Sequence, residues 1–115
     1  MLKAVSPIDG RYSNKTEKLQ DYFSEYALIK YRVRVEVQYL LALIDLGLPQ
    51  LTALADKKSE IEKIYDNFDI DNAQFIKETE KTTNHDVKAV EYYIKDEMEK
   101  LGLSEYLEWV HFALT

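Results

Sequence analysis

The segment Thr82-Thr83-Asn84-His85-Asp86 gathers side chains that can bind an anion and move a proton. Thr83 is a good helix N-cap, and Asp86 stands three positions later, where the second member of a capping box belongs. The early amides of such a helix lie at the positive end of its dipole and suit a phosphate or carboxylate. His85 can donate a hydrogen bond or transfer a proton near neutral pH, and Asn84 offers both a donor and an acceptor. By composition alone, however, the segment is more often an ordinary helix start.

The composition excludes several classes of function. A chain of 115 residues fits one domain, 1–115, and 46% apolar residues suffice for a packed core. The absence of Cys excludes disulfides, thiolate metal sites and cysteine nucleophiles, and fits a reducing cytoplasm. A net charge of −6 disfavours nucleic-acid binding, although residues 1–34 carry seven Lys and Arg against four Asp and Glu. We expect no signal peptide, because the N-terminus has no apolar core of the kind that such peptides need. We also expect no membrane partner, because charges interrupt the only long apolar stretch.

That long stretch, residues 24–46, is predicted to be a helix. Its middle, 31–39, alternates between apolar and polar residues, which by period alone favours a β-strand. Its length favours a helix, because strands usually have about five or six residues. No Gly or Pro interrupts the stretch, and Gly47 with Pro49 marks its end.

Local signals support the same helix. Ser24 is a good N-cap, and Arg32 and Glu36 have the i,i+4 spacing of a helical ion pair. The helix is too apolar for a surface position, which needs an apolar stripe only about 100° wide. We therefore expect further chain or other subunits to cover part of it.

The rest of the chain predicts shorter helical elements. Residues 1–23 are expected to form an extended lead-in, because Ser6-Pro7 and Asp9-Gly10 are turn signals. Asp71 with Gln74 resembles a capping box. The expected helices cover 51–55 (one turn), 59–67, 72–80, 87–101 (ended by Gly102) and a last segment from Ser104. The sequence thus predicts an all-α fold with about five helices.

The end of the chain is strongly apolar, from Trp109 to Leu114. Termini are usually loose and solvated, so this run predicts that the chain is part of a longer protein. The alternative is a C-terminal helix that docks its apolar side.

Four stretches of the sequence resemble a known family. They are Ser6–Tyr12 (SPIDGRY), Phe23–Tyr26 (FSEY), Thr82–Tyr92 (TTNHDVKAVEY) and His111–Ala113 (HFA). In this order and spacing they resemble the opening of the adenylosuccinate lyases, in the bacterial form with a long N-terminal segment. This family lies within the fumarase/aspartase superfamily. The TTNHDVKAVEY stretch is the most specific of the four, and together they span nearly the whole chain.

The resemblance implies a fold and an activity. It implies the N-terminal helical domain of a cytoplasmic homotetramer, in which each active site is built from three subunits. Such enzymes cleave adenylosuccinate to AMP and fumarate, and SAICAR to AICAR and fumarate, by β-elimination in purine biosynthesis. They need no metal or organic cofactor.

The resemblance also assigns residues by position. A guanidinium binds phosphate through two charge-assisted hydrogen bonds, which suits Arg11 to a nucleotide, although an Arg-Tyr pair is otherwise an ordinary surface feature. The implied substrate-binding residues are Arg11, Tyr12, Asn84, His85, Asp86 and Thr115.

The main catalytic residues are expected outside this chain. The family's acid, a His, and its base, a Ser, belong to later segments, so residues 1–115 alone are expected to be inactive. His85 is a candidate auxiliary residue, and His111 is expected to be a packed histidine of the last helix. The alternatives are a helical interaction module, or the opening of another superfamily lyase such as argininosuccinate lyase or fumarase.

Overall fold

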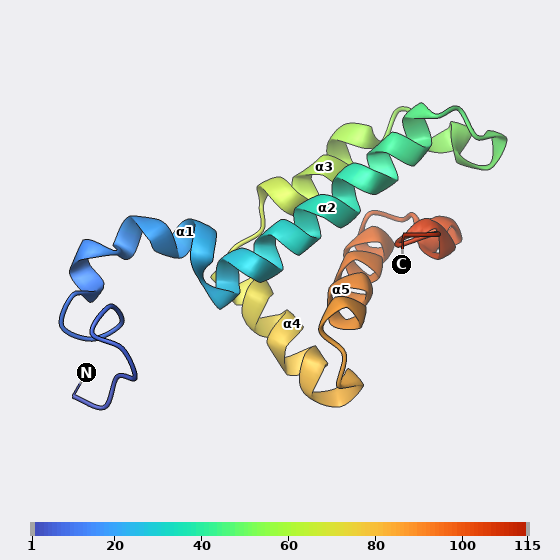
Figure 1. Cartoon of the computed structure of the whole chain (residues 1–115). Helices are drawn as coiled ribbons and strands as arrows, with labels where there is room; N and C mark the ends of the chain where they lie inside the picture. Colours follow the sequence, from blue (N-terminus) through green and yellow to red (C-terminus); the bar gives the residue numbers. More distant parts are fainter. Residues whose placement is uncertain (1, 115) are drawn as a thin grey trace.

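The computed structural model describes residues 2–114, which form helices joined by short turns (Figure 1). The α-helices are α1 (Gln20–Phe23), α2 (Glu25–Asp45), α3 (Lys58–Asp66), α4 (Ile70–Thr83) and α5 (Asp86–Lys100). The 3-10 helices are η1 (Ser13–Lys15), η2 (Glu17–Leu19), η3 (Pro49–Leu54) and η4 (Ser104–Trp109). The described residues contain no strand, and the predicted all-α fold class is confirmed.

Helix α2 is the long element against which the others pack (Figure 1). The Ser24 side chain accepts a hydrogen bond from the amide of Ala27 at 3.0 Å, so the predicted N-cap is confirmed. The helix ends before Gly47, whose φ of 84° is the left-handed conformation that glycine adopts without strain. The helical interpretation of the alternating stretch is therefore correct. Tertiary packing and the length of the stretch outweigh its strand-like period.

The core lies between α2, α3, α4 and α5. Val33, Val37 and Leu40 of α2 are fully buried together with Ile61 of α3 and Ile94 of α5. Burying each such side chain contributes roughly 1.5–3 kcal/mol to folding. This core fixes the relative positions of α2 and α5, which carry most of the site described below.

One side of α2 is not covered by the described residues. Leu28 and Val35 remain 47% and 56% exposed. The expectation that further chain or other subunits cover this side stays a prediction.

The start of α4 differs from the predicted one. Asp69, not Asp71, is the N-cap: its side chain accepts from the amide of Asn72 at 3.0 Å, and the Asn72 side chain accepts from the Asp69 amide at 3.1 Å. Asp69 has extended backbone, so Asp71 already lies in the first turn. Two Asp residues two positions apart offer alternative caps, and the helix begins at the earlier one.

The remaining helices agree with the expected segments. Helices α3 and α5 match the predicted 59–67 and 87–101 within one residue at each end. Gly102, with φ of 77°, follows α5, and η4 begins at Ser104 as expected. The predicted turn at 51–55 overlaps η3, which begins two residues earlier and ends one residue earlier.

Residues 2–23 form an arm that projects from the body (Figure 1). The extended lead-in predicted for 1–23 is wrong from Ser13 onward, because η1, η2 and α1 occupy most of 13–23. The radius of gyration is 16.7 Å, against about 13 Å for a compact chain of this length. The large hydrophobic side chains of the arm are exposed, and Phe23 is 85% exposed.

Among residues 2–114, no helix combines the length and the apolar character that crossing a membrane requires.

Candidate functional site

The junction between α4 and α5 carries the residues that the sequence singled out. Asn84 ends α4 in the left-handed conformation, with φ of 57°, which Asn tolerates better than most residues. His85 then has extended backbone, and its ring Nδ1 accepts a hydrogen bond from the Lys88 amide at 3.0 Å. His85 is therefore the N-cap of α5. The predicted cap at Thr83 is wrong, because Thr83 is the last residue of α4.

Thr83 has another role in this turn. Its hydroxyl donates to the His85 carbonyl at 3.1 Å and accepts from the His85 amide at 3.2 Å. These two bonds close the turn around Asn84, whose side chain is exposed, as is that of His85. The junction thus presents an amide and an imidazole on a fixed backbone.

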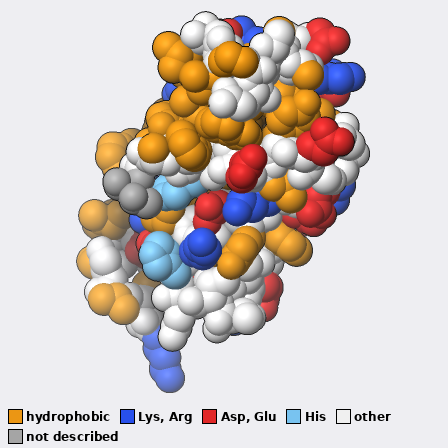
Figure 2. Space-filling model, turned by 90° about the vertical axis from the view of Figure 1, so that its right-hand side faces the viewer, with side chains coloured by type: hydrophobic (Ala, Val, Ile, Leu, Met, Phe, Trp, Pro, Cys, Tyr) orange, Lys and Arg blue, Asp and Glu red, His pale blue; other side chains and the backbone are white. Residues whose placement is uncertain are grey.

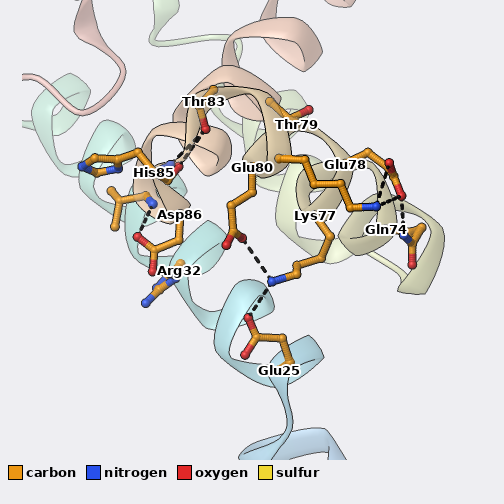
Figure 3. Close-up of polar contacts among 12 residues, drawn as sticks. Glu25, Arg32, Gln74, Lys77, Glu78, Thr79, Glu80, Thr83, His85 and Asp86 are labelled. Atoms are coloured by element: carbon orange, nitrogen blue, oxygen red, sulfur yellow. Dashed lines mark hydrogen bonds and ion pairs between the residues drawn. The ribbon is translucent and has the colours of Figure 1, made fainter.

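Asp86 is held by partners on two elements. One carboxylate oxygen accepts from the Val87 amide at 2.8 Å, and the other lies 2.8 Å from a guanidinium nitrogen of Arg32 on α2 (Figure 3). The hydrogen bond from Val87, followed by the charge of Arg32, lowers the pKa of Asp86 below its usual value. Asp86 is therefore ionised at neutral pH, and its charge is balanced by Arg32.

This arrangement corrects the predicted anion site. The Val87 amide is occupied by Asp86 and the Lys88 amide by His85, so these early amides of α5 are not free for a phosphate. An anionic substrate at this junction would instead be bound through the exposed side chains of Asn84 and His85.

Near the junction, Lys77 forms ion pairs with two carboxylates, one on α4 and one on α2. The Lys77 ammonium lies 3.2 Å from a carboxylate oxygen of Glu80 on α4 and 3.2 Å from one of Glu25 on α2 (Figure 3). The hydrogen bonds to Glu25 and Glu80 raise the pKa of Lys77. These ion pairs join the middle of α4 to the start of α2.

Arg11 and Tyr12 lie on the projecting arm. The backbone of the turn is closed by a bond from the Tyr12 amide to the Pro7 carbonyl at 2.8 Å. The Arg11 guanidinium carbon lies 5.5 Å from the centre of the Tyr12 ring, and both side chains are exposed. No hydrogen bond or ion pair joins residues 2–23 to the α4–α5 junction within the described part of the chain. The structure therefore does not bring the two predicted groups together in one chain.

The segment after η4 crosses α2. The Tyr39 hydroxyl donates to the Phe112 carbonyl at 2.7 Å, and His111 Nδ1 lies 2.5 Å from Glu36 Oε1. His111 has φ of 65°, a conformation that is uncommon outside glycine. The expectation that His111 packs within the last helix is wrong, because it lies beyond η4 and contacts a carboxylate. The predicted residue Thr115 lies outside the described residues.

A groove of about 330 Å³ runs between α2, α5 and this segment. Its polar lining includes Arg32, Glu36 and His111, and its apolar lining includes Val35 and Val90. The chain has two histidines, and both lie on the same face, with acidic and basic side chains nearby (Figure 2). The α4–α5 junction and His111, in the segment after η4, thus share one surface.

Arg32 and Glu36 contact the candidate site, and the sequence prediction did not include them among its site residues. They were predicted to pair with each other, and that ion pair is wrong: Arg32 pairs with Asp86, and Glu36 pairs with His111. A signal was present, because Glu36 stands in an apolar run of α2 and a buried carboxylate requires a partner. Its partner is 75 residues away and could not be chosen from spacing.

Among residues 2–114, no cluster of three or more His, Asp or Glu side chains has the arrangement of a metal site.

Comparison with known proteins finds similar sequences. No protein-family profile matches the chain. It is 51% identical over 119 residues to the adenylosuccinate lyase of Dictyostelium discoideum, and 48% identical over 118 residues to that of Legionella pneumophila (strain Corby). It is 44% identical over 117 residues to that of Escherichia coli (strain K12), and each alignment covers 99% of this chain. By sequence, the chain is similar to the N-terminal part of adenylosuccinate lyases.

The match concerns the opening of these enzymes. The chain spans about a quarter of the length of the relatives, 26% in each of the three. The resemblance in the four sequence stretches is thus confirmed for the N-terminal part of an adenylosuccinate lyase. These relatives support neither the opening of another superfamily lyase nor an isolated interaction module.

Proposed function

We propose that residues 1–115 are the substrate-binding N-terminal part of an adenylosuccinate lyase. Such an enzyme cleaves adenylosuccinate to AMP and fumarate, and SAICAR to AICAR and fumarate, in AMP and IMP biosynthesis. The observation that carries the proposal is the identity of 43–51% to adenylosuccinate lyases over 99% of the chain. The arrangement of the α4–α5 junction supports it.

The junction suits an anionic substrate because its own negative charge is balanced. Asp86 is paired with Arg32, so its carboxylate does not repel a phosphate or succinyl group as an isolated charge would. Asn84 and His85 are exposed beside it and can bind such groups by hydrogen bonds. Asp86 is the third substrate-binding residue of the junction, beside Asn84 and His85.

The reaction is a β-elimination. A base removes the proton from the succinyl carbon next to a carboxylate, the C–N bond breaks, and an acid protonates the departing nitrogen. We assign residues 1–115 to binding, with Thr115 as a further substrate contact. The main acid and base belong to later segments of the enzyme, and no metal or organic cofactor takes part.

The position of the arm favours a site shared between subunits. Among residues 2–114, no hydrogen bond or ion pair joins Arg11 or Tyr12 to the junction of their own chain. The arm also exposes apolar side chains such as Phe23. In a cytoplasmic homotetramer, the arm of one subunit would lie against another subunit and bring Arg11 to that subunit's substrate. A guanidinium there would bind phosphate through two parallel hydrogen bonds.

A chimera tests the proposal. The corresponding N-terminal part of the E. coli relative, 44% identical over 117 residues, is replaced by this chain, and fumarate release from adenylosuccinate is measured. We expect the chimera to release fumarate, and the isolated 115 residues to release none.

Two variants of the chimera serve as comparisons. Arg11→Ala is expected to weaken substrate binding, whereas Lys3→Ala, which removes another cation of the arm, is expected to leave the reaction unchanged. A folded, tetrameric chimera without fumarate release, or an Arg11 variant with unchanged kinetics, would contradict the proposal.

A further inference from the structure

The two histidines of the chain make different hydrogen bonds through the same ring atom. His85 Nδ1 accepts from the Lys88 amide at 3.0 Å. A backbone N–H can only donate, so His85 Nδ1 carries no proton, and the neutral ring is protonated at Nε2. His85 Nε2 is therefore a hydrogen-bond donor on the exposed side of the junction.

His111 has the opposite partner. Its Nδ1 lies 2.5 Å from Glu36 Oε1. An ionised carboxylate can only accept, so the proton of a neutral His111 ring lies on Nδ1, and Nε2 is left as the acceptor. With Glu36 as the acceptor, the hydrogen-bond partners assign the two tautomers.

Glu36 is placed to control this ring. Glu36 is only 5% exposed. Within residues 2–114, its second carboxylate oxygen, Oε2, has no hydrogen-bond partner. His111 is thus the sole described partner of a buried carboxylate. Leaving a buried carboxylate unpaired costs free energy, so conformations that keep the Glu36–His111 hydrogen bond are favoured over those that break it.

We propose that Glu36 is a positioning residue that holds His111 as the Nδ1–H tautomer. Glu36 and His111 both line the 330 Å³ groove, whose other walls are largely apolar. In such surroundings His111 Nε2 is an acceptor for an N–H or O–H group of a ligand. The face shared by the two histidines then offers one imidazole donor, His85, and one imidazole acceptor, His111 (Figure 2).

The two tautomers do not depend on the enzyme family. That a nucleotide substrate donates a hydrogen bond to His111 Nε2 rests on the proposed function. The two statements can fail separately, because the first is read from the free chain and the second from the fumarate release of the chimera.

Nitrogen-15 NMR of the full 115-residue chain tests the assignment. Spectra are recorded at about pH 8.5, roughly two units above the ordinary histidine pKa of about 6.5, where imidazole is neutral. With two histidines in the chain, the two rings can be assigned from His85→Gln and His111→Gln. We expect His111 to show a protonated Nδ1 and His85 a protonated Nε2. A wild-type His111 protonated at Nε2 would overturn the proposal without any further variant.

Two substitutions identify Glu36 as the cause. Glu36→Leu removes the acceptor and is expected to abolish the Nδ1–H signal of His111. Glu36→Gln keeps an acceptor oxygen and is expected to restore that signal. A matched control is Glu91→Leu, which removes another buried carboxylate that contacts Lys88 and Lys95 instead of a histidine.

The outcomes separate positioning from general loss of structure. The helical circular dichroism of all three variants is expected to match that of wild type, which reports that the helices are intact. An unchanged His111 tautomer in Glu36→Leu, its loss in Glu36→Gln, or an equal loss in Glu91→Leu would each overturn the proposal.

Discussion

Arg32 of α2 and Asp86 of α5 form a 2.8 Å ion pair across two helices. Through this contact the long helix fixes the first residue of α5 and, with it, the turn that carries Asn84 and His85. The buried core holds the helices together, and this polar contact joins the start of α5 to α2.

Arg32→Gln is expected to lower the free energy of unfolding by about 1 kcal/mol or less. Partly exposed ion pairs contribute about 0–1 kcal/mol, and both side chains are partly exposed. Urea unfolding at low and high salt measures the effect, which should shrink at high salt because ions screen the pair. Lys81→Gln is the control, because its pair with Glu78 joins exposed positions within α4. A salt-independent loss, or an equal loss in the control, would contradict the assigned contact.

Asp86→Asn is expected to reduce stability at neutral pH but not in acid. The bond from Val87 and the charge of Arg32 lower the pKa of Asp86, so the ionised carboxylate stabilises the folded state above the unfolded pKa of about 3.9. This contribution is lost as the pH falls through the lower, folded pKa. The difference between wild type and variant, less than about 1 kcal/mol at pH 6, should vanish near pH 2. Chemical denaturation across this range measures it, and a difference that persists in acid would count against the ion pair.

His85 combines a structural and a proposed binding role, and two substitutions separate them. His85→Ala removes the N-cap of α5 and is expected to cost about 1 kcal/mol. His85→Asn supplies a preferred N-cap residue and should recover most of that stability. Neither variant has an imidazole, so both should weaken substrate binding in the chimera. Recovery of fumarate release by His85→Asn would show that the cap alone matters.

The sequence predicted most of the helices, because their signals are local. Ser24, Gly47 and Gly102 marked helix ends through capping and turn chemistry that depends on neighbouring residues only. The same chemistry was ambiguous where candidates lay close together. The predicted N-caps were Asp71 and Thr83, whereas the structure has Asp69 as the N-cap of α4 and His85 as the N-cap of α5.

The polar contacts of the site could not be predicted, because they join distant parts of the chain. Arg32 and Glu36 had the spacing of a helical pair, yet each contacts a residue more than 50 positions away. The groove depends on the packing of α2 against α5, which periodicity does not specify. The residues of the α4–α5 junction were predicted from their order. The predicted anion site at the first amides of the helix was wrong, because two of these amides already donate hydrogen bonds to the side chains of His85 and Asp86.

Tyr93→Phe is expected to make the protein more resistant to alkali. Burial, followed by the charges of Glu97 and Asp69, raises the pKa of Tyr93 well above its ordinary value of about 10. The unfolded chain therefore ionises this phenol first, and stability falls by up to about 1.4 kcal/mol per pH unit between the two pKa values. The variant lacks this loss, so its alkaline unfolding midpoint should rise. Tyr22→Phe, at an exposed position, should leave the midpoint unchanged, and a shift of equal size there would refute the explanation.

His111→Ala is expected to destabilise the protein by about 3–5 kcal/mol, because it leaves the buried carboxylate of Glu36 without its described partner. Adding Glu36→Leu should recover most of this loss, because replacing both members of a buried pair with apolar groups is often nearly neutral. Urea unfolding of wild type, both single variants and the double variant gives the coupling free energy. If the two single losses simply add in the double variant, the contact between Glu36 and His111 contributes nothing to folding. A double variant more stable than His111→Ala instead locates the cost in the unpaired carboxylate. It would also explain why a histidine in a strained, left-handed conformation is held against α2.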